Sequence, residues 1–178
     1  MRSRFMLAAA ALALAACQPP AQAPQTPDTA QNEQLPPGVE ECNDVAPNMA
    51  RLVSVQDPIA AAAQATLAGG PIAPGIYDLV SATRIGQATG WADPRAAALD
   101  VSEGGDGVLT FNWASAPAGG QADRWSASFT DTPTPRLTYT CGRIGAVDAA
   151  FAVEGGNLQL RLPDGGAGSL DLVLARRG

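Results

Sequence analysis

The sequence contains no histidine and no lysine, because all 11 of its basic residues are arginine. A serine or cysteine nucleophile paired with a histidine base, and a lysine Schiff base, therefore cannot be built from this chain. A typical zinc site is excluded as well, because it needs histidine or several cysteines and only three cysteines are present. The densest carboxylate set, Asp100, Glu103 and Asp106, lacks the ligand pattern of an EF-hand loop and is interpreted as a hairpin turn. We predict no catalytic residue, no metal site, no cofactor and no enzymatic activity.

Positive charge is also scarce. The chain has 17 acidic residues against 11 arginines, and two of those arginines, Arg2 and Arg4, lie within the first four positions. The others are scattered, and only Arg176 and Arg177 are adjacent. Because binding to a phosphate backbone requires a clustered positive face, we predict no nucleic-acid partner.

A single long apolar run is present, at the start of the chain. Phe5 to Ala16 is apolar over 12 residues, whereas a membrane-spanning helix needs about 20. With Arg2 and Arg4 before it and small residues at its end, the run is typical of a signal peptide. We assign residues 1–16 to that signal peptide.

The signal peptide ends in Leu14-Ala15-Ala16, and Cys17 follows. This ending resembles the lipobox of bacterial lipoproteins, in which the signal peptidase cuts before a cysteine that has received a diacylglycerol. The resemblance implies that Cys17 is the lipidated first residue of the mature protein and that the membrane is contacted through this anchor. An ordinary secretory peptide cut near Ala16 is the alternative.

Residues 17–40 are interpreted as a tether, because they are rich in proline, glutamine and alanine and show no apolar periodicity. Such a composition cannot bury enough surface to offset its ordering entropy, so the segment should hold the folded domain away from the bilayer. Gln18 stands where an aspartate tends to retain Gram-negative lipoproteins in the inner membrane. The resemblance therefore implies an outer-membrane protein that faces the periplasm, with surface exposure as the alternative.

Residues 41–74 are predicted to form an N-terminal segment with one short helix. Asp57 and Pro58 suit the capping position and the first helical position, and residues 59–68 are nearly all helix-favouring. Gly69 and Gly70 would end the helix.

Residues 75–178 alternate between apolar and polar side chains, with turn residues every ten to fourteen positions. This pattern predicts antiparallel strands with one buried face and one solvated face. The expected strands are Ile76–Thr83, Arg95–Val101, Val108–Trp113, Arg124–Thr130, Arg136–Cys141, Val147–Val153, Asn157–Leu162 and Leu170–Ala175. Closing the last strand on the first removes both exposed edges, so we predict an all-β fold, an eight-stranded antiparallel up-and-down β-barrel with a short N-terminal helix. A β-sandwich of the same strands is the alternative.

The start of this region contains a short motif, Gly75-Ile76-Tyr77-Asp78-Leu79. Its Gly-x-Tyr-x-Leu pattern resembles the first strand of small lipocalin-like, calycin-type bacterial lipoproteins, and this implies a barrel. Periplasmic lysozyme inhibitors and metalloprotease inhibitors share the size, the lipid anchor and a disulfide, but their specific recognition motifs are not found in this sequence. The resemblance therefore supports the architecture more than any one activity.

The few aromatic residues, 5% of the chain, are concentrated in the strand region. We identify four of them, Trp91, Trp113, Trp125 and Tyr139, as candidate contacts for a ligand or a partner. Trp91 lies in a longer loop, 86–94, which in lipocalin-like barrels covers the open end; a tryptophan that simply caps the core is the alternative. An eight-stranded barrel is either filled by side chains or holds one small ligand, and the many large inward residues favour the filled form.

Cys42 and Cys141 remain as an even pair once Cys17 is assigned to the lipid anchor. Export places them in an oxidising compartment, so we predict a Cys42–Cys141 disulfide. With Cys141 on the face of Leu137 and Tyr139, the bridge would hold the N-terminal segment across one end of the barrel. Two free buried thiols are the alternative.

These features predict a monomeric, non-enzymatic outer-membrane lipoprotein whose barrel binds a small apolar ligand or an envelope protein. A periplasmic inhibitor or adaptor of a lytic enzyme or protease is one alternative, and a purely structural lipoprotein is another.

Overall fold

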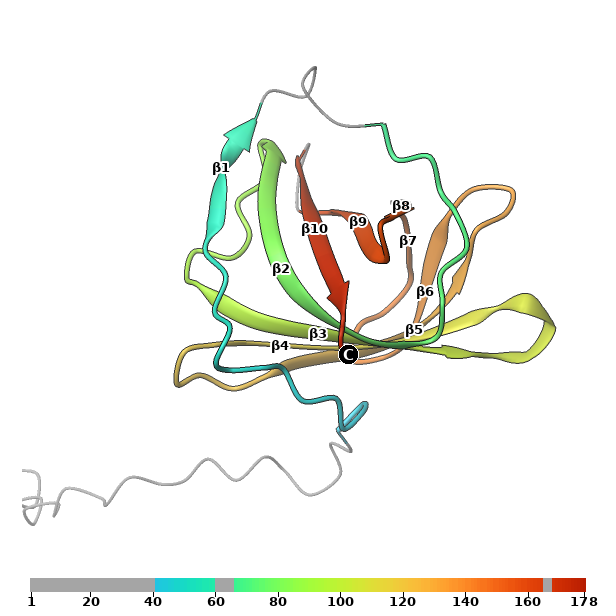
Figure 1. The fold of residues 1–178 in the computed structure, drawn as a ribbon, viewed down its shortest axis with the longest axis horizontal. Coiled ribbons are helices and arrows are strands. Elements are labelled where there is room, and N and C mark those ends of the chain that lie inside the picture. The colour runs from blue at the N-terminus through green and yellow to red at the C-terminus, as the bar shows by residue number, and fades with distance from the viewer. Residues whose placement is uncertain (1–40, 60–65, 165–167) are drawn as a thin grey trace, which may run out of the picture. The chain divides into compact units, whose positions relative to one another are not determined.

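The computed structural model describes residues 41–59, 66–164 and 168–178, which form an all-β fold (Figure 1). The strands are β1 (Val55–Ile59), β2 (Gly75–Gly86), β3 (Arg95–Glu103), β4 (Leu109–Pro117), β5 (Asp123–Thr130), β6 (Arg136–Cys141), β7 (Ala146–Asp148), β8 (Ala150–Glu154), β9 (Asn157–Pro163) and β10 (Gly168–Arg176). A 3₁₀ turn, η2 (Gly105–Gly107), joins β3 to β4, so Asp106 lies in a hairpin turn as predicted. Within the described ranges, no helix is long and apolar enough to cross a membrane.

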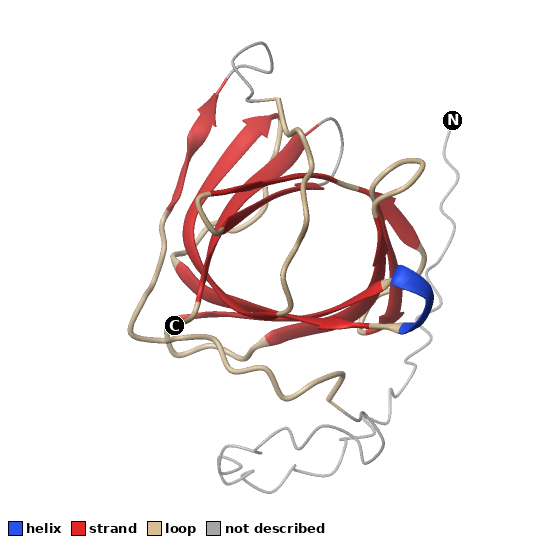
Figure 2. Ribbon diagram, turned by 45° about the vertical axis from the view of Figure 1, so that its right-hand side comes forward, coloured by secondary structure: helices blue, strands red, loops and turns tan. Residues whose placement is uncertain are grey.

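The strands close into an up-and-down barrel. Hydrogen-bonded neighbours follow the order β7-β6-β5-β4-β3-β2-β10-β9-β8. β7 and β8 are two halves of one predicted strand, Val147–Val153, interrupted at Ala149. β7 pairs with β6, and β8 pairs with β9. Because β7 and β8 follow each other directly in the chain, the two ends of the sheet meet there and the sheet forms a ring (Figure 2). The predicted barrel is confirmed, and the sandwich alternative is wrong.

The predicted capping site of the N-terminal helix lies in a strand instead. Asp57, Pro58 and Ile59 belong to β1, residues 60–65 are outside the described residues, and residues 66–68 form no regular element. β2 pairs with β3 only from Gly75 to Asp78, so its second half has an open edge. β1 fills that edge in parallel orientation, and this pairing overrides the local helix preference. The helix prediction is therefore wrong for residues 57–59 and 66–68.

The Cys42–Cys141 disulfide is present, with 5.5 Å between the two Cα atoms. Its placement differs from the prediction, because the β5–β6 register shifts between Ser126 and Ala127. Cys141 pairs with Ser126, whereas Tyr139 pairs with Ala127, so one extra residue of β6 lies between them. This bulge turns Cys141 away from the face of Tyr139 and toward the outer wall. The bridge therefore fixes the N-terminal segment on the outside of the barrel rather than across its end.

Residues 42–46, which we call the strap, run along this outer wall. The side chain of Asn43 donates hydrogen bonds to the backbone oxygens of Trp113, at 3.3 Å, and Trp125, at 3.0 Å. Val45 packs in a small buried cluster with Ala98 of β3 and Ala114 of β4. The strap thus ties three neighbouring strands together from outside.

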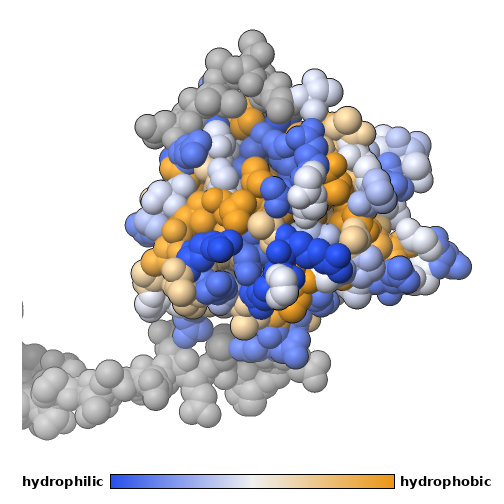
Figure 3. All heavy atoms as spheres, in the orientation of Figure 1, coloured by the Kyte–Doolittle hydropathy of each residue, from blue (hydrophilic) through white to orange (hydrophobic). Residues whose placement is uncertain are grey.

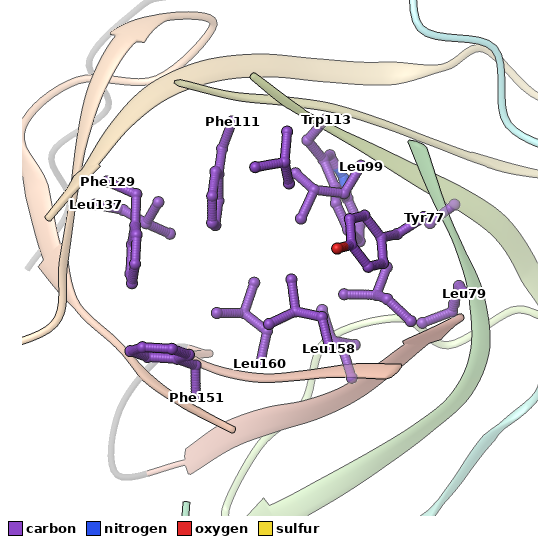
Figure 4. Packing of buried hydrophobic residues seen from close by; sticks show 14 of the residues in the cluster. Tyr77, Leu79, Leu99, Phe111, Trp113, Phe129, Leu137, Phe151, Leu158 and Leu160 are labelled. Carbon is purple, nitrogen blue, oxygen red and sulfur yellow. The ribbon is translucent and has the colours of Figure 1, made fainter. Parts of the chain in front are cut away.

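The predicted inner-face residues fill the barrel interior. The buried cluster includes Phe111, Trp113, Trp125, Phe129, Leu137, Phe151, Leu158, Leu160, Leu170, Leu172 and Leu174. Among them, Phe111 and Phe129 point inward from one part of the wall toward Phe151, Leu158 and Leu160 on another (Figure 4). Phe129 contacts both Phe111, with ring centroids 4.8 Å apart, and Phe151, at 5.2 Å. The period-two alternation is confirmed at these positions, with Cys141 as the exception already described.

Two buried carboxylates on the outer wall are held in ion pairs. Asp78 accepts two hydrogen bonds from Arg177, at 2.5 and 3.0 Å, and Asp171 accepts two from Arg161, at 2.6 and 2.7 Å. The hydrogen bond with Asp78 raises the pKa of Arg177 and outweighs the opposing effect of burial. These pairs stabilise the wall where β9, β10 and β2 adjoin, which is a structural role.

Candidate functional site

The aromatic residues identified in the sequence meet at one end of the barrel, which we call the Trp91 end. Three connections lie there: residues 87–94 between β2 and β3, 118–122 between β4 and β5, and 142–145 between β6 and β7. In an up-and-down barrel every second connection lies at the same end, so these loops share one rim.

Trp91, Trp113, Trp125 and Tyr139 form a continuous set of ring contacts, which we call the aromatic row. Trp91 stacks on Trp113 with centroids 6.1 Å apart, and Trp113 stacks on Trp125 at 5.7 Å. Tyr139 meets Trp125 edge to face at 5.4 Å. Trp113 and Trp125 are 2% and 1% exposed, whereas Trp91 and Tyr139 are half-buried. The row therefore has two buried rings in its middle and a half-buried ring at each end.

The row follows from the register of the sheet. Trp113 on β4 lies directly opposite Trp125 on β5, and both are inward-facing positions. Cross-strand aromatic pairs of this kind contribute more than their burial alone. The β4–β5 register brings Trp113 and Trp125 together, the β5–β6 pairing adds Tyr139, and the loop between β2 and β3 adds Trp91.

The loop that carries Trp91 is held by side chains from two other parts of the barrel. The carboxylate of Asp164 accepts hydrogen bonds from the backbone N–H groups of Thr89, at 2.9 Å, and Gly90, at 2.6 Å. Arg84 donates to the backbone oxygens of Gly90, at 3.1 Å, and Trp91, at 2.7 Å. The backbone of Trp91 is left-handed, with φ of 58°. This conformation is strained for a bulky residue, so tertiary contacts must maintain it.

Gly90 offers a direct test of this anchoring. A Cβ atom at Gly90 would lie 2.3 Å from Oδ1 of Asp164, so Gly90→Ala should displace the carboxylate and release the loop. We expect a loss of about 1–2 kcal/mol in unfolding free energy and a red-shifted tryptophan emission. Urea unfolding and fluorescence measure the two effects.

Gly105→Ala is the matched control, because no atom lies within 4 Å of a Cβ atom at Gly105. It should change neither the stability nor the emission. Equal losses in the two variants would show that Asp164 does not anchor the loop.

Two arginines complete the Trp91 end. The guanidinium of Arg95 lies over the Trp91 ring, 5.0 Å from its centroid, and Nη1 donates to Oγ of Ser115 at 3.4 Å. Arg143 lies 5.8 Å from the ring centroids of both Trp125 and Tyr139 and pairs with Asp123 at 2.9 Å. Such contacts are cation–π interactions. The site therefore presents flat apolar rings together with positive charge.

The sequence reasoning missed both arginines. Arg95, Ala97 and Leu99 are alternate residues of β3 and therefore share one face of the strand. Because Ala97 and Leu99 face the core, the alternation already indicated that the side chain of Arg95 points inward. Arg143 lies in a turn, where no periodicity exists, and no pattern in the sequence could have placed it beside Tyr139.

Among the described residues, three clefts lie away from the aromatic row, and none of its four rings lines them. Two lie at the opposite end, where residues 66–74 cross the barrel opening (Figure 2); their volumes are about 420 and 70 Å³, and both are lined in part by Gly70, Asp131 and Phe151. The third, of about 570 Å³, lies on the outer wall beside Leu52 and Val80. Hydrophobic and hydrophilic patches lie side by side on the face drawn in Figure 3.

Across residues 41–59, 66–164 and 168–178, no group of three or more histidine, cysteine, aspartate or glutamate side chains is placed to hold a metal ion. Comparison of the chain with protein-family models, with curated proteins and with solved structures finds no match. Any function must therefore be argued from the chemistry of the site itself.

Proposed function

We propose that this chain is a non-enzymatic, lipid-anchored envelope protein that binds a small apolar ligand at the Trp91 end of its barrel. The observation that carries the proposal is the aromatic row, which connects the packed interior to a half-buried ring at the rim. Aromatic rings with a few polar groups at an opening are typical of sites for flat apolar ligands.

The ligand would bind at the end of the barrel and not deep inside it. Phe111 and Trp125 are 0% and 1% exposed and belong to a cluster that spans the interior. A ligand within that cluster would have to displace several of these side chains. The indole of Trp91, in contrast, occupies a place between solvent and Trp113 that a ligand ring of similar size could take.

Binding of a neutral flat probe, 2-naphthylmethanol, tests this proposal on the full-length protein. We expect saturable shifts of the tryptophan indole N–H signals by NMR, largest for Trp91 and Trp113. Trp91→Gly should bind the probe at least about threefold more tightly, because the side chain that competes for the place is gone. No binding, or equal affinity in the two proteins, would reject a site at this end.

A protein partner at the same end is the second candidate, and one exposed side chain favours it. Ile144, in the turn between β6 and β7, is 100% exposed and lies next to Arg143. A protein interface would bury Ile144, whereas a small ligand beside Trp113 would not reach it. Ile144→Ser should therefore weaken binding of an envelope protein but leave the naphthylmethanol affinity unchanged.

The lipid anchor is tested separately through Cys17. We expect Cys17→Ser to abolish labelling by a fatty-acid analogue and to leave an unprocessed or soluble protein, because the acylated thiol is lost. Metabolic labelling followed by membrane fractionation measures both effects. Labelling that persists in the variant would contradict the anchor, and sorting of the wild type to the inner membrane would contradict the outer-membrane location.

A further inference from the structure

Arg95 is a cation at the Trp91 end for which the described residues supply no carboxylate partner. Four other arginines, Arg136, Arg143, Arg161 and Arg177, each pair with an aspartate. Arg95 instead contacts the hydroxyl of Ser115 through Nη1, and its Nε atom is buried without a hydrogen-bond partner. A buried N–H group without an acceptor is rare in folded proteins and calls for an explanation.

The backbone of Trp91 provides a second, independent sign at the same place. Its left-handed φ of 58° is unfavourable for a residue of this size, and its ring covers the guanidinium of Arg95. Strained backbone and unpaired polar groups concentrate at binding sites, where a ligand relieves the cost. Removal of the Trp91 ring would uncover Arg95 and free the space beside Trp113 in one step.

We propose that Arg95 binds the carboxylate of a flat apolar ligand whose ring takes the place of Trp91 against Trp113. The planar guanidinium can donate from Nε and from an Nη atom to the two carboxylate oxygens, which gives the unpaired Nε its acceptor. Ser115 is fully buried, and its Oγ accepts a hydrogen bond from Nη1 of Arg95, so this hydroxyl is placed to join the same network. This inference rests on the proposed function and specifies its ligand class.

Neighbouring charges permit an anion at Arg95. Asp123 lies directly across the sheet from Ser115, but its carboxylate is bound to Arg143 at 2.9 Å, so that pair has no net charge. Arg84 donates to the backbone of the loop that carries Trp91 and adds a positive charge to this end. Asp164 accepts hydrogen bonds from the same loop and offsets that charge. Arg136, which pairs with Asp148 at 2.6 Å and lies outside the Trp91 end, is the matched control for Arg95.

The test compares 2-naphthoate with its neutral analogue 2-naphthylmethanol on the full-length protein by titration calorimetry. We expect the wild type to prefer the carboxylate by at least about tenfold, because hydrogen bonds to charged groups are the strong ones. Arg95→Gln should remove this preference and change the affinity for the alcohol less than twofold. Arg136→Gln should retain the preference. In wild-type protein, naphthoate should shift one arginine Nε–H NMR signal, and that signal should be missing in Arg95→Lys.

The outcomes separate this inference from the function on which it rests. If the alcohol and the carboxylate bind equally, or if the preference survives Arg95→Gln, the carboxylate inference fails while the binding site at the Trp91 end stands. If neither compound binds, both fail. If Arg95→Gln does not fold, the wild type alone still decides the question. The inference is wrong if naphthoate shifts no arginine Nε–H signal of the wild-type protein.

Discussion

Reduction of the Cys42–Cys141 disulfide is expected to lower the free energy of unfolding by about 3–5 kcal/mol. The bridge joins residues 99 positions apart, and closing a loop of this length restricts the unfolded chain strongly. Its loss also frees the strap, whose Asn43 side chain bonds to the backbones of β4 and β5. Urea unfolding with and without reductant measures the change.

Serine variants make this prediction specific. Cys42→Ser, Cys141→Ser and the double variant should be destabilised equally, because each removes the same bond. Thr140→Ser, an exposed neighbour of Cys141 on β6, is the matched control and should stay within about 0.5 kcal/mol of the wild type. An unfolding midpoint that does not respond to reductant would contradict the role of the bridge.

Phe111→Ala is expected to cost about 3–5 kcal/mol and to create a cavity inside the barrel. Phe111 is 0% exposed, and its ring stacks on Phe129 with centroids 4.8 Å apart, so the surrounding side chains cannot fill the space without losing their own contacts. Apolar cavities of this kind stay dry and bind small apolar molecules. Benzene should therefore raise the melting temperature of the variant by more than it raises that of the wild type.

The control for this cavity is Thr138→Val on β6. Thr138 is exposed on the outer face and keeps a β-branched side chain after the substitution, so the change should stay within about 0.5 kcal/mol. A wild type that is stabilised by benzene as strongly as Phe111→Ala would show that the barrel interior already has room for a ligand, and the site would then not be confined to the Trp91 end.

Most of the barrel could be predicted because its signal is local. Inward residues recur at every second position, and glycine-rich turns separate the runs, so β6 coincides with its predicted range, Arg136–Cys141. The break at Ala149 was not predicted. It arises because β7 pairs with β6 while β8 pairs with β9, and no periodicity within Val147–Val153 reveals a change of partner.

The two errors in the N-terminal half and in β6 share one cause. Asp57 and Pro58 carry a good helix-start signal, but the open edge of β2 is a property of the assembled sheet and gives β1 its partner. Cys141 follows Leu137 and Tyr139 in perfect alternation, yet the β5–β6 bulge turns it to the other face. In both cases a distant strand decided between conformations that the local residues allow.

The sequence by itself determined the class of fold, most of the inward-facing residues and the absence of histidine and lysine chemistry, because these depend on residue type and on period-two spacing. The tertiary structure decided the functional geometry. The pairing of β4 with β5 set the register that stacks Trp113 on Trp125, and the contacts of Arg84 and Asp164 placed Trp91 over Arg95. Such contacts join residues up to 75 positions apart, and spacing within one strand carries no information about them.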